Sequence, residues 1–157
     1  MTTGKARATT EPPTCSIERS LGVIGERWTF LILRQAHAGT ERFADFEAAL
    51  GIAPNLLTAR LDTLVRAGVM EKREYREPGQ RARPSYHLTQ AGIDLRLVLG
   101  AIQQWGDRYM PLASGPIIAR QNIATGKPVR VGFIDEHDQP VDQADVTISA
   151  PITHQQS

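Results

Sequence analysis

Residues 43–64 read FADFEAALGIAPNLLTARLDTL, and this stretch decides the fold. Phe43, Phe46 and Leu50 recur at steps of three and four, which predicts a short helix that ends at Gly51. Pro54 suits the first turn of a second helix. Three leucines share one face of that second helix: Leu57, Leu61 and Leu64. Two short helices joined by a tight turn predict a helix-turn-helix.

The segment before this motif also has a helical pattern. Apolar residues recur at steps of three and four at Ile17, Leu21, Ile24, Trp28 and Leu31. Gly22 and Gly25 interrupt the run, and each glycine inside a helix costs about 1 kcal/mol relative to alanine. We therefore expect a bend or break near Gly25. Residues 1–14 are polar and rich in Thr and Pro, which predicts a disordered arm.

The segment after the motif predicts a hairpin and then a long helix. Residues 69–76 and 82–88 flank the polar turn Glu77-Pro-Gly-Gln80, which is typical of a β-hairpin. Thr89 suits the N-cap of a helix that continues to Tyr109. Two adjoining apolar lines follow this helix: Ile93, Leu97 and Ala101, and Leu95, Ile102, Trp105 and Tyr109. A helix that is apolar on two sides needs a partner.

The remainder of the chain changes character after Pro111 and Gly115-Pro116. Apolar residues alternate on either side of a turn at 136–140: Val129, Val131 and Phe133 before it, and Val141, Val146 and Ile148 after it. This pattern predicts a small β-rich extension over residues 117–157. The predicted fold class is therefore mainly α (α+β), with a winged helix-turn-helix and its dimerisation helix over residues 15–113.

Composition favours an ordinary folded domain. The 157 residues are 41% hydrophobic and 22% charged, close to the globular average. No apolar run approaches the ~20 residues that cross a bilayer, and the first 13 residues lack the apolar stretch of a signal peptide. We therefore expect a cytoplasmic protein. A single cysteine can form no intramolecular disulfide, so packing must hold the fold together.

Charge is unevenly distributed although the net charge is only +1. Residues 52–88 contain seven Arg or Lys against four Asp or Glu, whereas residues 121–157 contain two against five. The middle of the chain is therefore basic and its tail acidic, an asymmetry that the net charge hides.

Seven segments occur in register along the chain: CSIER (15–19), GERWTFLILR (25–34), RFADF (42–46), IAPNLLTARL (52–61), AGV (67–69), YHLTQAG (86–92) and WG (105–106). Together they resemble the HxlR-type bacterial transcription regulators over residues 15 to about 110. The resemblance implies a homodimer that binds a roughly two-fold operator near a promoter and pairs its terminal helices. One departure is Ala53, where the family often has serine, so a hydroxyl cap worth about 1 kcal/mol is absent.

The apolar residues outside the motif independently predict a dimer. A symmetric dimer would cover the long apolar helix and place two DNA-binding motifs about one duplex turn apart, ~34 Å. Aromatic side chains at helical spacing usually lie in a core or interface rather than around a ligand. We expect the dimer interface to contain Ile17, Leu21, Leu95, Ile102, Trp105 and Tyr109.

The second helix of the motif is expected to read double-stranded DNA. Asn55 can pair with the edge of adenine, and Thr58 or Ala59 can touch a thymine methyl group. The alternative is that these are ordinary solvated positions. Arg60 has two interpretations, a phosphate contact or an ion pair with a nearby acid such as Asp62 or Glu47.

The hairpin tip predicts a second DNA contact. Gln80, Arg81 and Arg83 decorate the turn, where a wing would reach the backbone or the minor groove. A charged tip is also typical of a merely soluble hairpin. Lys72 and Arg73 could also contact phosphates, but the acids interleaved with them are typical of a solvated strand.

Cys15 raises the question of a signal. It precedes the first helix, with Glu18 three residues further on as in a capping arrangement. The positive end of a helix and Arg19 would lower the pKa of this thiol and raise its reactivity. Some HxlR-type relatives sense oxidants, quinones or aldehydes through a cysteine near this place, which makes Cys15 a candidate sensor. The alternative is a small, inert cysteine.

Two hypotheses of different classes remain. The first is a DNA-binding regulator, a repressor in its simplest form, that responds to a redox, electrophile or small-molecule signal. The second is a winged-helix scaffold that binds small molecules or proteins without reading DNA. The histidines are dispersed and no nucleophile stands beside a base, so we expect neither an enzyme, nor a metal site, nor a cofactor.

Overall fold

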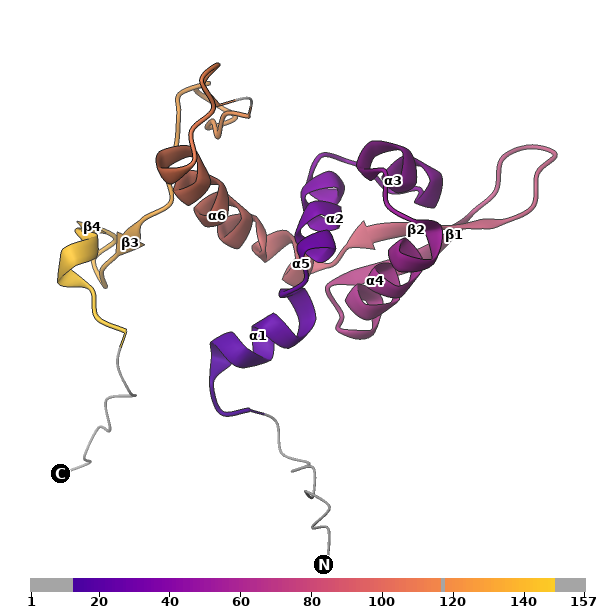
Figure 1. Ribbon diagram of the computed structural model, residues 1–157, viewed down its shortest axis with the longest axis horizontal. Helices are drawn as coiled ribbons and strands as arrows, with labels where there is room; N and C mark the ends of the chain where they lie inside the picture. The colour runs from indigo at the N-terminus through magenta and orange to yellow at the C-terminus, as the bar shows by residue number, and fades with distance from the viewer. Residues whose placement is uncertain (1–12, 117, 149–157) are drawn as a thin grey trace, which may run out of the picture. The chain divides into compact units, whose positions relative to one another are not determined.

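The computed structural model describes residues 13–116 and 118–148 (Figure 1). In chain order the helices and strands are α1 (Ser16–Ile24), α2 (Arg27–His37), α3 (Phe43–Leu50), α4 (Pro54–Arg66), β1 (Met70–Tyr75), β2 (Arg83–Leu88), α5 (Gln90–Asp94), α6 (Arg96–Tyr109), β3 (Phe133–Ile134), β4 (Pro140–Val141) and the 3₁₀ turn η1 (Gln143–Asp145). The chain divides within α6 into two compact units, one up to Leu99 and one from Gly100. This order confirms the predicted mainly α, winged helix-turn-helix class.

The break predicted near Gly25 is confirmed. The backbone N–H of Gly25 donates to the carbonyl of Leu21 at 2.9 Å and ends α1. A Cβ atom on Gly25 would lie 2.5 Å from that carbonyl oxygen, so only glycine allows this close approach. α2 then begins at Arg27 in a new direction.

The helix-turn-helix is also confirmed. Gly51 ends α3 in the left-handed conformation with φ 60°, which glycine adopts without strain. Pro54 is the first residue of α4, where its missing N–H leaves no hydrogen bond unmade. The core of this unit is built around fully buried side chains of α2, α3 and α4: Ile32, Leu33, Phe46, Leu57, Leu61 and Leu64.

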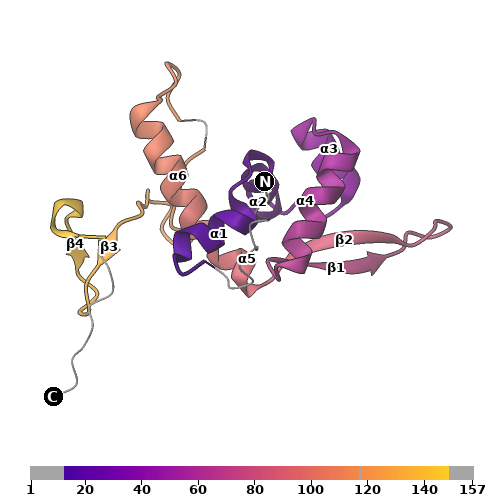
Figure 2. The same cartoon turned by 60° about the horizontal axis from the view of Figure 1, so that its bottom comes forward.

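The predicted hairpin forms the wing. β1 and β2 pair antiparallel, with Met70 opposite Leu88 and Tyr75 opposite Arg83. The loop that joins them extends away from α3 and α4 in both views (Figures 1 and 2). The segment between α2 and α3 pairs with β2 along its free edge. Tyr86 N–H donates to Glu41 O at 2.8 Å, and Arg42 and Ser85 form an isolated antiparallel β-bridge.

The long helix predicted over residues 90–109 is interrupted. α5 ends at Asp94, its C-cap Leu95 has a ψ of −8° that departs from the helical value, and α6 begins at Arg96. α5 is held against the wing: Thr89 Oγ1 donates to Gly68 O at 2.6 Å, and Gly92 approaches Val69 so closely that a Cβ would lie 2.2 Å from its carbonyl oxygen. These contacts fix the direction of α5 before α6 starts.

The tail contains less β structure than its alternation predicts. β3 and β4 are two residues each, joined by a turn that Asp135 stabilises by accepting from the N–H groups of His137 and Gln139. Val129, Val131, Val146 and Ile148 lie outside both strands. The alternation therefore overpredicted the length of the strands. Val129 N–H donates to Arg120 O at 2.9 Å beside an isolated bridge of Gln121 with Pro128, and Val131 N–H donates to the side chain of Gln104 at 2.9 Å.

No helix among the described residues is both long and apolar enough to cross a membrane.

Candidate nucleic-acid interface

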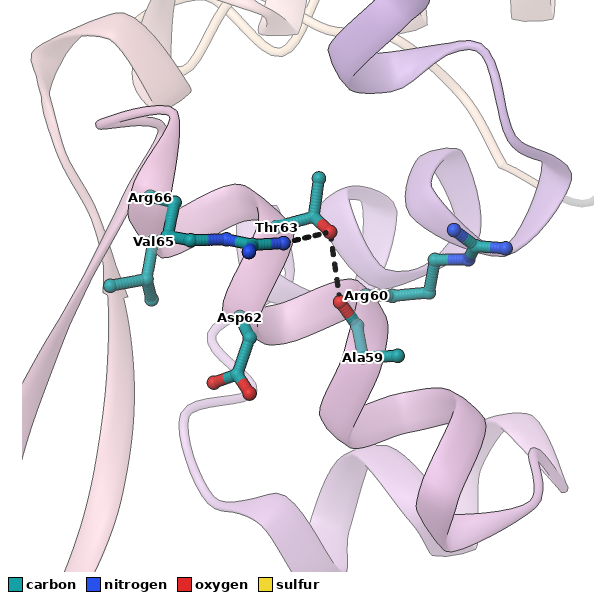
Figure 3. A pocket seen from close by; sticks show the side chains of 6 residues that line it. All are labelled: Ala59, Arg60, Asp62, Thr63, Val65 and Arg66. Carbon is teal, nitrogen blue, oxygen red and sulfur yellow. Dashed lines mark hydrogen bonds between the residues drawn. The ribbon is translucent and has the colours of Figure 1, made fainter.

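The face of α4 opposite the core is exposed to solvent. Asn55, Ala59, Asp62 and Arg66 follow one another at steps of four, three and four, so they form one stripe along the helix. The C-terminal half of this face is slightly hollowed and is lined by Ala59, Arg60, Asp62, Thr63, Val65 and Arg66 (Figure 3). All six come from one helix, so the hollow is an open surface suited to a large partner.

Arg60 turns away from this stripe and pairs with an acid that the sequence did not suggest. Its Nη2 lies 3.3 Å from Glu26 Oε2 at the start of α2, and Figure 3 shows its side chain leaving the helix on the side away from Asp62. The guanidinium is partly buried, with 26% of the side chain exposed, and its Nε has no hydrogen-bond partner among the described residues. The geometry thus supports an ion pair within the protein.

The start of α4 lacks a side-chain cap, as expected from Ala53. Asn55 partly replaces it, because its Oδ1 accepts from the N–H of Leu56 at 2.9 Å. Thr58 Oγ1 donates to the carbonyl of Pro54 at 2.9 Å, a bond within the helix. The side-chain oxygen of Asn55 and the hydroxyl proton of Thr58 are therefore engaged by the backbone of α4.

The wing tip carries free positive charge. Gln80, Arg81 and Arg83 are exposed, and the ion pairs of the described residues involve neither arginine. In contrast, Arg73 pairs with Glu71 on its own strand. The cations of the strand are thus neutralised, while those of the tip are available to phosphates.

The stem of the wing is fixed to the rest of the unit. Lys72 Nζ lies 3.6 Å from Asp62 Oδ1 on α4, which links β1 to the exposed helix. Arg42 pairs with Glu77 at 2.8 Å and lies over the ring of Tyr75. The helix and the wing are therefore presented together rather than as independent elements.

Apolar side chains are exposed on α1 and on α6. Ile17 and Leu21 are more than half exposed, and the same holds for Trp105 and Tyr109, whose ring centroids lie 5.4 Å apart. Ile102 is 49% exposed on the same stripe. Leu95 differs from the other expected interface residues because it is partly buried against the core.

Cys15 is exposed and stands immediately before α1. Arg19 holds the segment that leads into α1, because its guanidinium donates to the carbonyls of Pro13 and Thr14, both at 2.7 Å. The backbone N–H groups of Glu18 and Ile17, and then the charge of Arg19, lower the pKa of the Cys15 thiol. This environment favours the thiolate.

Sequence reasoning missed Glu26 as the partner of Arg60, and it did not place Arg66 on the exposed stripe of α4. The stripe that begins at Asn55 reaches Arg66 after eleven residues, so the helical period alone could have found it. Glu26 lies 34 residues before Arg60, and no local pattern connects the two positions.

A wing, an exposed second helix and a basic tip define a winged helix-turn-helix protein, a class that binds DNA. Comparisons with known proteins agree. The HxlR-like helix-turn-helix family model matches residues 23–114. The transcriptional regulator Mb3122 of Mycobacterium bovis is 39% identical over 122 residues, 78% of this chain and 76% of that protein.

Solved structures give the same result. PA1607, a proposed transcription factor, is 34% identical with a TM-score of 0.76 over 88% of this chain and 96% of its own. The redox regulator HypR in its reduced form is 25% identical with a TM-score of 0.54, over 61% of this chain and 96% of its own. The chain belongs to the HxlR-like helix-turn-helix family and is a DNA-binding transcription regulator.

Proposed function

We propose that the protein is a homodimeric repressor that binds a two-fold operator through α4 and the wing. The observation that carries this proposal is the exposed stripe of α4 beside two unpaired arginines of the wing, Arg81 and Arg83. α4 would lie in the major groove with Asn55, Thr58 and Ala59 toward the bases. Gln80 and the two arginines would contact the backbone or the minor groove. Arg60 would position α4 through Glu26.

The proposed dimer is supported by the way in which the tail of the second unit packs against only one face of α6. Gln104 forms two hydrogen bonds with the backbone of Val131, both 2.9 Å, and Gln103 donates to Ile118 O at 2.6 Å. At about 100° per residue these glutamines lie opposite the stripe of Ile102, Trp105 and Tyr109. The tail thus occupies the polar face of α6, and the apolar face remains for a partner.

A second copy is the partner that the apolar stripes favour. Two-fold pairing would bury the stripe of each α6, together with Ile17 and Leu21 of α1, and would also create the symmetry that a two-fold operator requires. Leu95, the remaining residue expected at the interface, is partly buried against the core of the first unit.

A gel-shift titration against the DNA upstream of the gene tests the proposal. We expect one specific complex whose affinity falls steeply with salt, since phosphate contacts release counterions. In vitro transcription from the same fragment should fall when the protein is added. Absence of binding to any genomic fragment at low salt would favour the alternative, a scaffold for small molecules or proteins.

The signal is proposed to act through Cys15. Its lowered pKa and exposure favour reaction with oxidants or electrophiles, and one structural relative is described as a redox regulator. We expect oxidant to weaken DNA binding by the wild-type protein but not by Cys15→Ser. An ordinary thiol titration together with an unchanged response in Cys15→Ser would refute this role while leaving the DNA-binding proposal intact.

A further inference from the structure

The hydroxyl of Thr58 is already used within α4. Thr58 Oγ1 donates to Pro54 O at 2.9 Å, although the residue is exposed on the N-terminal half of the helix. A hydroxyl has one proton, so Thr58 cannot donate to a base unless this bond breaks. The same bond restricts the side chain, because threonine in a helix selects its rotamer partly through this contact. What Thr58 can still offer a partner is its methyl group and the acceptor lone pairs of the hydroxyl oxygen.

The side-chain oxygen of Asn55 also forms a hydrogen bond within α4. The atom that faces Leu56 N–H at 2.9 Å must be the carbonyl oxygen, because the backbone N–H can only donate. A bidentate pair with adenine needs that oxygen to accept from the base while the NH₂ group donates. The bond to Leu56 competes with this arrangement, since the N–H at the start of the helix has no other acceptor to replace the cap that Ala53 lacks. Asn55 keeps an amide donor.

Ala59 completes the pattern. It is exposed between Asn55 and Asp62 and offers only a methyl group. The N-terminal half of the exposed face thus presents two methyl groups, the NH₂ group of Asn55 and the acceptor lone pairs of Thr58 Oγ1. Such a surface matches the C5 methyl group of thymine, the one apolar feature of the major-groove edges.

We propose that α4 selects its operator by apolar contact, with the Thr58 methyl group against the C5 methyl group of a thymine in each half-site. This inference rests on the proposed binding of α4 in the major groove. It assigns the base preference at this position to the methyl group of Thr58 rather than to its hydroxyl group. The variants Thr58→Val and Thr58→Ser, which are close to threonine in size, separate these two alternatives.

The experiment begins with operator DNA selected by the full-length wild-type protein from random duplexes. Each thymine of the selected site is then replaced by uracil, which removes only the methyl group. At one position per half-site, we expect uracil to weaken wild-type binding about three- to fivefold, the effect of one buried methyl group. Thr58→Val keeps the methyl group without the hydroxyl and should show the same loss at the same position. Thr58→Ser keeps the hydroxyl without the methyl group and should bind the two bases equally.

Three outcomes would overturn the inference: a wild-type scan without a sensitive position, a sensitivity that persists in Thr58→Ser, or loss of base preference in Thr58→Val. Thermal unfolding of both variants checks that the fold is unchanged, as expected for an exposed position. Failure of the wild-type protein to select any DNA would instead refute the proposed function, so the two failures are distinguishable.

Discussion

Individual basic residues of the DNA-binding unit fall into two groups. Arg42, Arg60, Lys72 and Arg73 each have an acidic partner, at Glu77, Glu26, Asp62 and Glu71. Arg81 and Arg83 are exposed outside these pairs. Exposed ion pairs contribute little to stability, but each paired cation is partly neutralised before DNA arrives. The two groups should therefore differ in how strongly they affect the salt dependence of binding.

Arg81→Ala should weaken DNA binding at all sequences and reduce the salt slope by about one unit for each wing that contacts a phosphate. The measurement is the binding constant as a function of salt concentration. Arg73→Ala is the matched control, because its guanidinium is already paired with Glu71, and its slope should match that of the wild type. Equal salt slopes of the binding constant for the wild type and Arg81→Ala would show that Arg81 does not contact a DNA phosphate.

His37 should make stability depend on pH. Its Nε2 lies 3.1 Å from Gly92 O, and burial followed by the charge of Arg96 lowers its pKa below the usual value. The unfolded chain then binds more protons between the two pKa values, so stability is complete above the unfolded pKa and is lost as the pH falls from there to the folded pKa.

His37→Gln, which keeps a donor for Gly92 O, should lose less stability than the wild type between about pH 8 and pH 5. Urea unfolding at each pH measures the difference. Parallel curves for the two proteins would show that His37 does not titrate in this way.

Residue roles were the least predictable part of the site. The sequence left Arg60 two roles, a phosphate contact or an ion pair with a nearby acid such as Asp62 or Glu47. The actual partner, Glu26, becomes a neighbour only when α2 packs near α4. Likewise, the hydrogen bond from Leu56 N–H to Asn55 Oδ1 depends on backbone geometry, which the identity of the residue does not specify.

At the scale of elements, the weak start of α4 is open to improvement. Ala53→Ser should supply a side-chain acceptor for the first N–H groups and raise the free energy of unfolding by up to ~1 kcal/mol, the gain being limited because Asn55 already accepts from Leu56. Thermal unfolding measures the change. Ala48→Ser, inside α3, adds the same hydroxyl where no cap is needed and should be neutral or slightly destabilising. A gain no larger than that of Ala48→Ser would contradict the prediction.

The contact between α5 and the wing predicts opposite effects for two glycines. Gly92→Ala would place a Cβ 2.2 Å from Val69 O and 2.9 Å from Leu88 Cδ2, so it should destabilise the fold by ~2 kcal/mol or more. Gly22→Ala, inside α1 with open space around it, should be neutral or stabilising by up to ~1 kcal/mol. Urea denaturation compares the two variants, and a tolerated Gly92→Ala would show that α5 is not held against the wing.

Elements with a strong period were predictable, and those fixed by tertiary contacts were not. The stripe of Leu57, Leu61 and Leu64 identified α4 because burial imposes the helical period on the sequence. The break at Leu95 carries no glycine or proline signal of its own, since contacts of α5 with residues 68 and 69 produce it. The alternation of the tail overpredicted strand length because the backbone N–H of Val129 donates to Arg120 and that of Val131 to the side chain of Gln104, contacts that the pattern does not encode.

For the whole molecule, the apolar stripe of α6 should control assembly. Trp105→Asp should dissociate the proposed dimer and abolish cooperative binding to the two-fold operator, because a charge would replace an aromatic ring at the centre of the interface. Sedimentation velocity measures the mass. Ile123→Asp is the control, since Ile123 is 99% exposed in the tail outside this stripe. A monomeric wild type, or a dimeric Trp105→Asp, would refute the assigned interface.

The stem of the wing has a thermodynamic consequence. The hydrogen bond from Tyr86 N–H to Glu41 O and the ion pair between Lys72 and Asp62 hold both edges of the hairpin before any DNA is present. The conformational entropy lost on association should therefore come mostly from the exposed side chains of the tip, while the backbone of the stem is already ordered. Calorimetry should then give a binding heat capacity change that matches rigid docking, without the additional negative contribution of a segment that folds as it binds.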